Sequence, residues 1–200
     1  MELVRQQAFE RLMDQIVKGN NVLDTSNGSD VNFADYSAWH TQTLVLLDHF
    51  PSSFKRYIYE FENQKENTLK GAKECIAILG RLGQDLPTYW IEPDKNEIIT
   101  EQYDSEIIEK ITHQIDIGNN NILTTIANCP IKAYVDSSVY VAWHTQTLTL
   151  LDHLSLSTMR YTLEIKDNKL HMLKNVSASI NLLKCLSEDI KNGIVTQKIK

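Results

Sequence analysis

Glycine and proline are scarce in this chain, with seven and four residues among 200. Folds rich in β-strands need many glycine and proline turns, so this shortage favours helices. Long apolar runs are also missing, and none approaches the roughly 18–20 residues that a helix needs to cross a bilayer. The charged opening stretch, MELVRQQAFERLMDQIV, lacks the apolar core of a signal peptide. We therefore expect no membrane association.

Cysteine and positive charge are scarce as well. The three cysteines, Cys75, Cys129 and Cys185, form no CxxC pair, which is typical of reduced thiols in a cytoplasmic protein. The formal net charge is −6, and an acidic chain is poorly suited to neutralise the phosphates of duplex nucleic acid. Hydrophobic residues make up 42% of the chain, which is enough for a packed core. We expect a globular, cytoplasmic protein that does not bind duplex nucleic acid.

One phrase of the sequence occurs twice. Residues 38–49 read AWHTQTLVLLDH and residues 142–153 read AWHTQTLTLLDH, so only Val45 and Thr149 differ. Internal repeats define the architecture of a chain before any single element does. The phrase therefore indicates a duplication.

The similarity extends along both halves at the same shift of 104 residues. Identical pairs include Tyr36 with Tyr140, Arg56 with Arg160, Tyr57 with Tyr161, and Asp85 with Asp189. Upstream the shift becomes 99, as Gly19 and Gly118 show, so the second half contains an insertion of five residues. We predict a first helical repeat over 1–90, a linker over 91–102 and a second helical repeat over 103–200.

Helical spacing of apolar residues recurs in both predicted repeats. One apolar face is formed by Phe9, Leu12, Ile16 and Val17. Gly19 and Gly118 predict the end of the first helix in each repeat. The phrase forms a second helix, capped by Asp30 or Asp35; a short helix over 53–62 and a longer fourth helix follow. We expect an all-α fold of two tandem four-helix units, packed as one pseudo-symmetric body.

The phrase divides into stripes on a helical wheel. Trp39 and Thr43 belong to an apolar stripe that any core-facing helix needs. A second stripe contains His40, Leu44 and Asp48, with Thr41 beside it. Its counterpart in the second phrase contains His144, Thr145, Leu148 and Asp152.

This second stripe is identical in both copies, although residues 50–91 match residues 154–195 at only 11 of 42 positions. Three interpretations stay open. The helix is buried on several sides, and His40 and Gln42 are satisfied interior polar groups. Alternatively, the two stripes line an interface that joins the repeats or frames a ligand pocket between them. In the third interpretation they bind a protein partner.

No catalytic or metal-binding pattern is present, so we expect neither an enzyme nor a cofactor. His40 and His49 point about 180° apart on one helix and cannot bind one ion together. The chain has no ExxH or HExxH motif, no glycine-rich phosphate loop and no GxSxG. HEPN ribonucleases carry an Arg followed, after four to six residues, by His. None of the five arginines has that spacing, and the nearest is Arg160 with His171.

A small helical accessory domain of bacterial and phage proteins, HEPN-like in layout, has a similar spacing of aromatic and apolar residues. The chain resembles it at Tyr36, Trp39, Leu46-Leu47, Ser53, Tyr57 and Phe61. In that family the domain is often fused to TIR-like, nuclease or nucleotide-sensing effectors of antiviral defence. This sequence contains the module twice and no effector domain. The resemblance therefore implies a binding protein that lacks the effector's chemistry.

We expect a non-enzymatic defence or anti-defence factor that sequesters a nucleotide-type signal between its helices. Arginines would bind phosphate and aromatic rings would stack on the base. The expected ligand-binding residues are Trp39, His40, Thr43, Arg56, Tyr57, Trp143, His144, Thr147, Arg160 and Tyr161. The expected interface residues are Thr41, Leu44, Asp48, Thr145, Leu148 and Asp152. The alternatives are a protein–protein interaction module that inhibits a defence effector or toxin, and a degenerate HEPN-like ribonuclease. A homo-oligomer is compatible with each.

Overall fold

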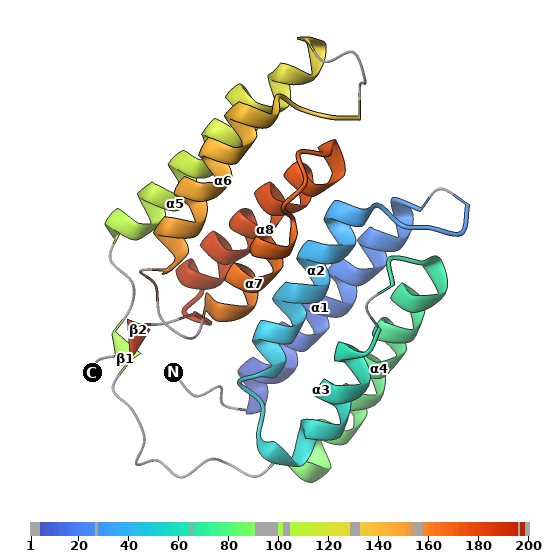
Figure 1. Ribbon diagram of the computed structural model, residues 1–200. Coiled ribbons are helices and arrows are strands. Elements are labelled where there is room, and N and C mark those ends of the chain that lie inside the picture. The colour runs from blue at the N-terminus through green and yellow to red at the C-terminus, as the bar shows by residue number, and fades with distance from the viewer. Residues whose placement is uncertain are drawn as a thin grey trace. The chain divides into compact units, whose positions relative to one another are not determined.

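The computed structural model divides into two compact units, Met1–Ile98 and Ile99–Lys200 (Figure 1). It describes residues 5–26, 28–64, 66–90, 100–101, 105–128, 133–152, 154, 158–195 and 197–198. The predicted linker over 91–102 lies outside the described residues except for Thr100 and Glu101.

Four α-helices build the first unit. They are α1 (Arg5–Asp24), α2 (Phe33–Leu47), α3 (Lys55–Glu62) and α4 (Leu69–Tyr89), with the 3₁₀ turn η1 (Ser52–Phe54) before α3. Helix α1 packs against α2 and α4, and α3 packs against α2 and α4 (Figure 1). The core between them is apolar, and its most buried members include Leu12, Leu46, Leu47, Phe61, Leu79 and Leu82.

The second unit also has four α-helices. They are α5 (Ser105–Ile117), α6 (Ser137–Asp152), α7 (Met159–Asp167) and α8 (Leu173–Lys191). Helix α5 packs against α6 and α8, and α7 packs against the same two helices. Two very short strands, β1 (Thr100–Glu101) and β2 (Gln197–Lys198), pair antiparallel. The prediction of an all-α fold is confirmed.

Helix α1 runs through Gly19, so the predicted helix end at Gly19 is wrong. A Cβ on Gly19 would lie 2.5 Å from Trp39 Cζ2 and 3.0 Å from Ile76 Cγ1. On Gly118 it would lie 2.7 Å from Ile180 Cγ1 and 3.2 Å from Trp143 Cζ2. Both glycines therefore serve the close approach of neighbouring helices. The predicted helix end at Gly118 is nevertheless confirmed, because α5 ends at Ile117.

The N-terminus of α2 is capped by Asn32, not by Asp30 or Asp35. Asn32 Oδ1 accepts hydrogen bonds from the backbone N–H groups of Ala34 (2.9 Å) and Asp35 (3.2 Å). Asp136 accepts from Ser138 and Val139 at the start of α6. A short polar side chain at this position satisfies donors that the first helical turn leaves unpaired.

The first helix of the second unit continues into a wider turn, whereas α1 is α-helical over its whole length. After Ile117 the chain makes a π turn, η2 (Gly118–Ile122), and a 3₁₀ turn, η3 (Leu123–Asn128). Thr25 Oγ1 donates to Val22 O in the first unit, and Thr125 Oγ1 donates to Ile122 O in the second, each over 2.7 Å. Gly19 and Thr25 are six residues apart, whereas Gly118 and Thr125 are seven apart. The π turn absorbs this additional residue.

The other four inserted residues follow in the next loop. Asn32 N donates to Thr25 Oγ1 across seven residues, and Asp136 N donates to Thr125 Oγ1 across eleven. One residue in the π turn and four in this loop add up to the change of the sequence shift from 99 to 104. Among the described residues, no helix has the length and apolar character that crossing a membrane requires.

Candidate functional site

The polar residues of the repeated phrase form hydrogen bonds within their own unit. Trp39 Nε1 donates to the Gln15 carbonyl over 2.9 Å, and Thr43 Oγ1 donates to Gln15 Oε1 over 3.0 Å. Gln15 is itself buried. These two bonds satisfy the polar groups that α2 brings into the core, as buried polar groups require.

The corresponding bonds occur in the second unit. Trp143 Nε1 donates to the Gln114 carbonyl over 2.9 Å, and Thr147 Oγ1 donates to Gln114 Oε1 over 3.2 Å. The phrase therefore depends on a glutamine of the preceding helix. In the sequence, the sign of these hydrogen bonds was that Gln15 matches Gln114 between the two halves. Both glutamines lie beside apolar residues.

The first histidine of each phrase binds the end of the short third helix of its unit. His40 Nε2 lies 3.2 Å from the Phe61 carbonyl in α3, and His144 Nε2 lies 2.8 Å from the Ile165 carbonyl in α7. A carbonyl oxygen accepts only, so Nε2 carries the hydrogen in both contacts. The Phe61 carbonyl already accepts from the Gln64 N–H over 3.0 Å, and the Ile165 carbonyl from the Asn168 N–H over 3.1 Å. His40 and His144 each add a second donor from a neighbouring helix, which the two lone pairs of a carbonyl oxygen allow.

Tyrosine hydroxyls hold the chain just beyond the same helix. Tyr36 donates to the Gln64 carbonyl and Tyr140 to the Asn168 carbonyl. Burial raises the pKa of Tyr140 to about 12, and it raises that of Tyr36 still further from its ordinary value. Each tyrosine, together with the histidine four residues later, thereby fixes where the third helix of its unit ends and the loop to the fourth begins.

Another tyrosine of the third helix reaches the fourth. Tyr57 donates to Asp85 Oδ2, and Tyr161 donates to Asp189 Oδ2 over 2.6 Å. Tyr161 and Asp189 are fully buried, whereas Tyr57 is partly exposed. The hydrogen bond to Asp85 raises the pKa of Tyr57, whereas burial is the main reason that the pKa of Tyr161 is raised.

The expected ligand-binding residues do not line one surface of either unit. Trp39, Thr43, Trp143, Thr147 and Tyr161 are buried among core residues. The His40 ring lies between two aromatic rings. It stacks on Tyr36 and Phe61, with ring-centroid distances of 5.5 and 4.8 Å. The Arg56 side chain is 85% exposed and pairs with Glu60 over 2.7 Å. His144 and Arg160 are half-buried.

The expected interface residues differ between the two phrases. Thr41 and Leu44 are buried in the first unit, and Asp48 is exposed. In the second unit Thr145 and Asp152 are exposed. The remaining member, Leu148, is half-buried. That the two stripes meet across the repeats stays a prediction.

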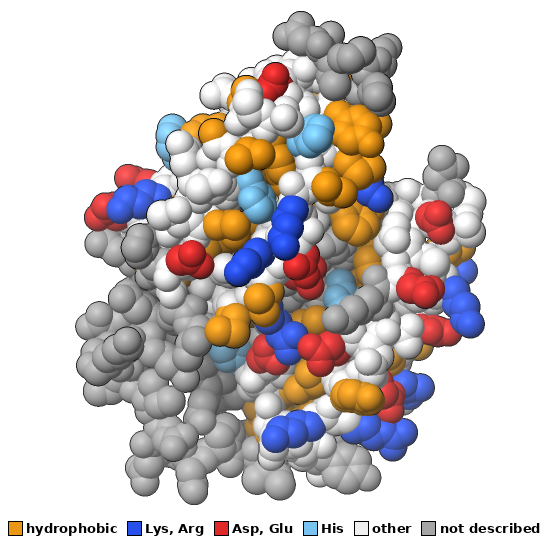
Figure 2. Space-filling view, in the orientation of Figure 1, with side chains coloured by type: hydrophobic (Ala, Val, Ile, Leu, Met, Phe, Trp, Pro, Cys, Tyr) orange, Lys and Arg blue, Asp and Glu red, His pale blue; other side chains and the backbone are white. Residues whose placement is uncertain are grey.

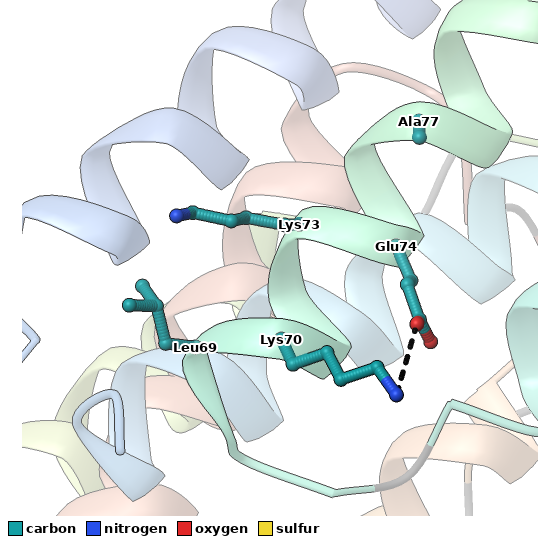
Figure 3. Close-up of a pocket in the computed structure, with 5 residues that line it drawn as sticks. All are labelled: Leu69, Lys70, Lys73, Glu74 and Ala77. Atoms are coloured by element: carbon teal, nitrogen blue, oxygen red, sulfur yellow. Dashed lines mark ion pairs between the residues drawn. The ribbon is translucent and has the colours of Figure 1, made fainter. Parts of the chain in front are cut away.

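Two neighbouring depressions lie on the surface of the first unit. The first, about 370 Å³, is lined by Leu69, Lys70, Lys73, Glu74 and Ala77, all from α4 (Figure 3). Lys70 Nζ lies 3.7 Å from Glu74 Oε1, and Lys73 points away from this pair. The second, about 470 Å³, lies between α3 and α4 and is lined by Tyr59, Glu60, Asn63, Gln64, Glu74, Ala77, Ile78 and Arg81.

Helix α1 carries an apolar stripe on its exposed side. The helical spacing in the sequence assigned part of this stripe to the core side. Phe9, Met13 and Val17 are 42%, 42% and 56% exposed. The residues of α1 that enter the core are Ala8, Leu12, Gln15, Gly19 and Val22. Phe9 and Val17 were expected on the core face, but small and polar residues take that place because Trp39 and Thr43 need Gly19 and Gln15 there.

Metal binding has no support in the described part of the chain, where no group of three or more His, Cys, Asp or Glu side chains could hold an ion.

Burial raises the pKa of the Cys75 thiol to about 12, which makes it a poor nucleophile. Cys185 forms no disulfide within the described residues, and Cys129 lies outside them. Lys and Arg side chains intermix with Asp and Glu on the face shown in Figure 2.

No family model, curated protein or solved structure matches this chain. Its function is therefore inferred from the chemistry of its own surfaces.

Proposed function

We propose that the protein is a protein–protein interaction module without chemistry of its own, and that it binds an amphipathic helix of its partner on the outer side of α1. The exposed Phe9–Met13–Val17 stripe carries this proposal. The three residues recur at every fourth position, so they lie in one row along the helix. Apolar anchors in such a row are the usual receptor for the apolar face of a partner helix.

The second unit keeps only one apolar residue of this stripe at the corresponding positions, Ile108 in place of Phe9. At the shift of 99, Met13 corresponds to Thr112 and Val17 to Asp116, both exposed on α5. The folding of a four-helix unit therefore does not require an apolar surface there. Exposed apolar groups that the fold does not need are typical of binding surfaces.

Helix α4 extends the surface beside the stripe. A Cβ on Gly83 would lie 3.9 Å from the Phe9 ring, and a Cβ on Gly80 would meet no atom within 4 Å. The corresponding residues of α8 are Ser187 and Lys184. Without side chains at Gly80 and Gly83, this part of α4 would let a partner helix approach closely.

Acidic residues border the stripe and favour a basic partner. Glu10 and Asp14 are exposed on α1, and Asp14 pairs with Lys18 over 3.2 Å. Lys or Arg residues flanking the apolar face of the partner helix would complement them. The resemblance to accessory modules of antiviral defence leads us to propose a defence effector or toxin as the partner.

Exchange of stripe residues for those of the second unit tests this function. The double variant Met13→Thr/Val17→Asp, purified beside the parent from cells that carry a defence system, should lose a protein that the parent retains. Leu163→Thr is the matched control, since Leu163 is also exposed, at 53%. Retention of the same proteins by all three chains excludes the stripe as the binding surface.

A nucleotide-type ligand is a second candidate, favoured by the depression between α3 and α4. Tyr59 is 68% exposed there and offers a ring for stacking. Arg81 lies 2.9 Å from Glu60, which also pairs with Arg56, so two guanidinium groups share one carboxylate. Glu74 also lines the depression, so binding of a phosphate there would rely on the guanidinium groups of Arg81 and the nearby Arg56.

Thermal melting with cyclic nucleotides and ADP-ribose tests the second candidate. A ligand present at 100 times its Kd stabilises the folded protein by about 2.7 kcal/mol, which should raise Tm by several degrees. Tyr59→Ala should abolish the shift, whereas Tyr57→Phe should retain it. Absence of a shift with every nucleotide excludes this function and leaves the helix-binding proposal intact.

A further inference from the structure

The exposed apolar stripe of α1 has borders of opposite charge, and the border toward α2 is acidic. Glu10 and Asp14 each directly follow a stripe residue, so they lie about 100° further round the helix, where they are exposed. Lys18 pairs with Asp14 over 3.2 Å and donates to Gln42 Oε1 of α2 over 3.4 Å, so α2 lies on this side. Arg11 and Lys18 lie still further round the helix and are half-buried. Carboxylates therefore form the solvent-facing border here.

The opposite border, toward α4, is basic. Gly83 of α4 faces this side of α1, since a Cβ on it would lie 3.9 Å from the Phe9 ring. Arg5 lies one turn before Phe9 and is exposed. Lys73 of α4 is exposed as well, and it points away from Glu74 toward α1 (Figure 3). Glu74 lines the depression on the α3 side of α4, so the charges that border the stripe here are positive.

The basic border accompanies the whole length of the stripe. Arg5 lies before its first residue. Lys73 lies near its other end, because Ile76, three residues further along α4, would be 3.0 Å from a Cβ on Gly19. A helix that covers the stripe therefore passes between cations on one side and carboxylates on the other.

The second unit keeps neither Asp14 nor Lys73. Asp14 corresponds to His113 at the shift of 99, and Lys73 corresponds to Ser177 at the shift of 104. The folding of a four-helix unit therefore requires neither charge. Like the apolar stripe that they border, these charges are features that binding explains and folding does not.

We infer that the partner of this surface is a helix whose apolar face lies between one acidic edge and one basic edge, and that the two borders set the direction in which it lies along α1. The inference rests on the proposed function, since it names the partner of the same stripe. A helix turned end to end exchanges its edges, so it would place like charges against both borders. Edge charges set the orientation of paired helices in coiled coils in the same way.

Synthetic helices test this inference on the full chain. Three peptides of about 18 residues, ~27 Å long as helices, share one leucine face and differ only in their edges, which are one acidic and one basic, both basic, or both acidic. Isothermal titration calorimetry at low salt should show that the mixed peptide binds roughly tenfold more tightly than the others, because it alone meets both borders with opposite charge. The difference should shrink in about 1 M salt.

Charge reversal on the basic border gives the second measurement. In Arg5→Glu/Lys73→Glu both borders are acidic, so the peptide with two basic edges should bind most tightly. Lys166→Glu/Lys169→Glu is the matched control, because it changes the net charge equally at exposed lysines of the second unit, and it should keep the preference of the parent. Circular dichroism confirms that both variants are folded.

The outcomes separate this inference from the proposed function. Equal affinity of the parent for the mixed and the basic peptides, or a preference that survives Arg5→Glu/Lys73→Glu, overturns the inference alone if Met13→Thr/Val17→Asp weakens every peptide. Binding that Met13→Thr/Val17→Asp leaves unchanged occurs elsewhere and overturns both. Failure of all three peptides to bind the parent also overturns both.

Discussion

Tyr161 donates a 2.6 Å hydrogen bond to Asp189 Oδ2, and both side chains are completely excluded from solvent. Tyr57 and Asp85 form the corresponding bond at the partly exposed surface of the first unit. The same pair thus exists in two environments within one chain. Water can replace the lost donor for Asp85 but not for Asp189.

Removing the hydroxyl should therefore have unequal effects. Tyr161→Phe should lower the free energy of unfolding by roughly 1–3 kcal/mol, because it deprives a buried carboxylate of a donor. Tyr57→Phe should lower it by less than about 1 kcal/mol. Urea unfolding of the two variants measures both values. Equal losses would show that burial does not set the strength of this bond.

Alkaline pH should destabilise the protein. The folded state raises the pKa of Cys75 and Tyr140 to about 12, whereas the unfolded values are about 8.5 and 10. The unfolded state thus releases these protons first, so the stabilisation is complete below about pH 8.5 and declines as pH rises toward 12. Urea midpoints between pH 7 and 11 measure the decline. Tyr140→Phe should make it shallower above pH 10, and an unchanged slope contradicts the assignment.

Gly19 should not tolerate a methyl group. Gly19→Ala places Cβ 2.5 Å from Trp39 Cζ2, and overpacking of this kind costs roughly 1–3 kcal/mol. Gly80→Ala is the matched control, since its Cβ meets open space and alanine favours a helix interior by about 0.5–1 kcal/mol. Thermal unfolding should show opposite shifts in Tm. Shifts of the same sign would refute the close-approach role.

Thr43 and Thr147 should each stabilise their unit through the buried glutamine. Thr43→Val leaves Gln15 Oε1 without its donor and should cost roughly 1–3 kcal/mol. In the double variant Thr43→Val/Gln15→Leu, both polar partners are removed, and part of the loss should be recovered. The control, Thr149→Val, restores the residue found at position 45 and should change stability by less than about 0.5 kcal/mol. A double-mutant cycle by urea unfolding measures the coupling.

The wheel predicts a core position for Trp39 and Thr43, and both are buried in the structure. For α1 the helical spacing assigns the wrong side to the core, because two neighbouring stripes of that helix could both face it. Phe9 and Val17 are the more apolar residues, yet Gln15 and Gly19 face the core. Which side of α1 packs against the core depends on the shape and the hydrogen-bonding groups of α2. The periodicity of apolar residues carries information on neither.

The contacts of His40 and Tyr36 were equally hidden from sequence reasoning. Their acceptors are backbone carbonyls of Phe61 and Gln64, and a backbone acceptor leaves no mark on residue identity. The cap of α2 was misplaced for a similar reason. Asp30, Asn32 and Asp35 are all suitable capping residues, and only the backbone path decides that Asn32 lies at the helix start.

The π turn at Gly118 makes the length of a helix adjustable without moving what comes before or after it. Trp143 still reaches Gln114, and Thr125 still holds the following loop, although one residue more lies between the glycine and that threonine. Deletion of Asn120 should let this segment close into a regular α-helix like α1. Each unit of this kind can therefore gain or lose single residues at one point, and its loops can diversify while its framework stays the same.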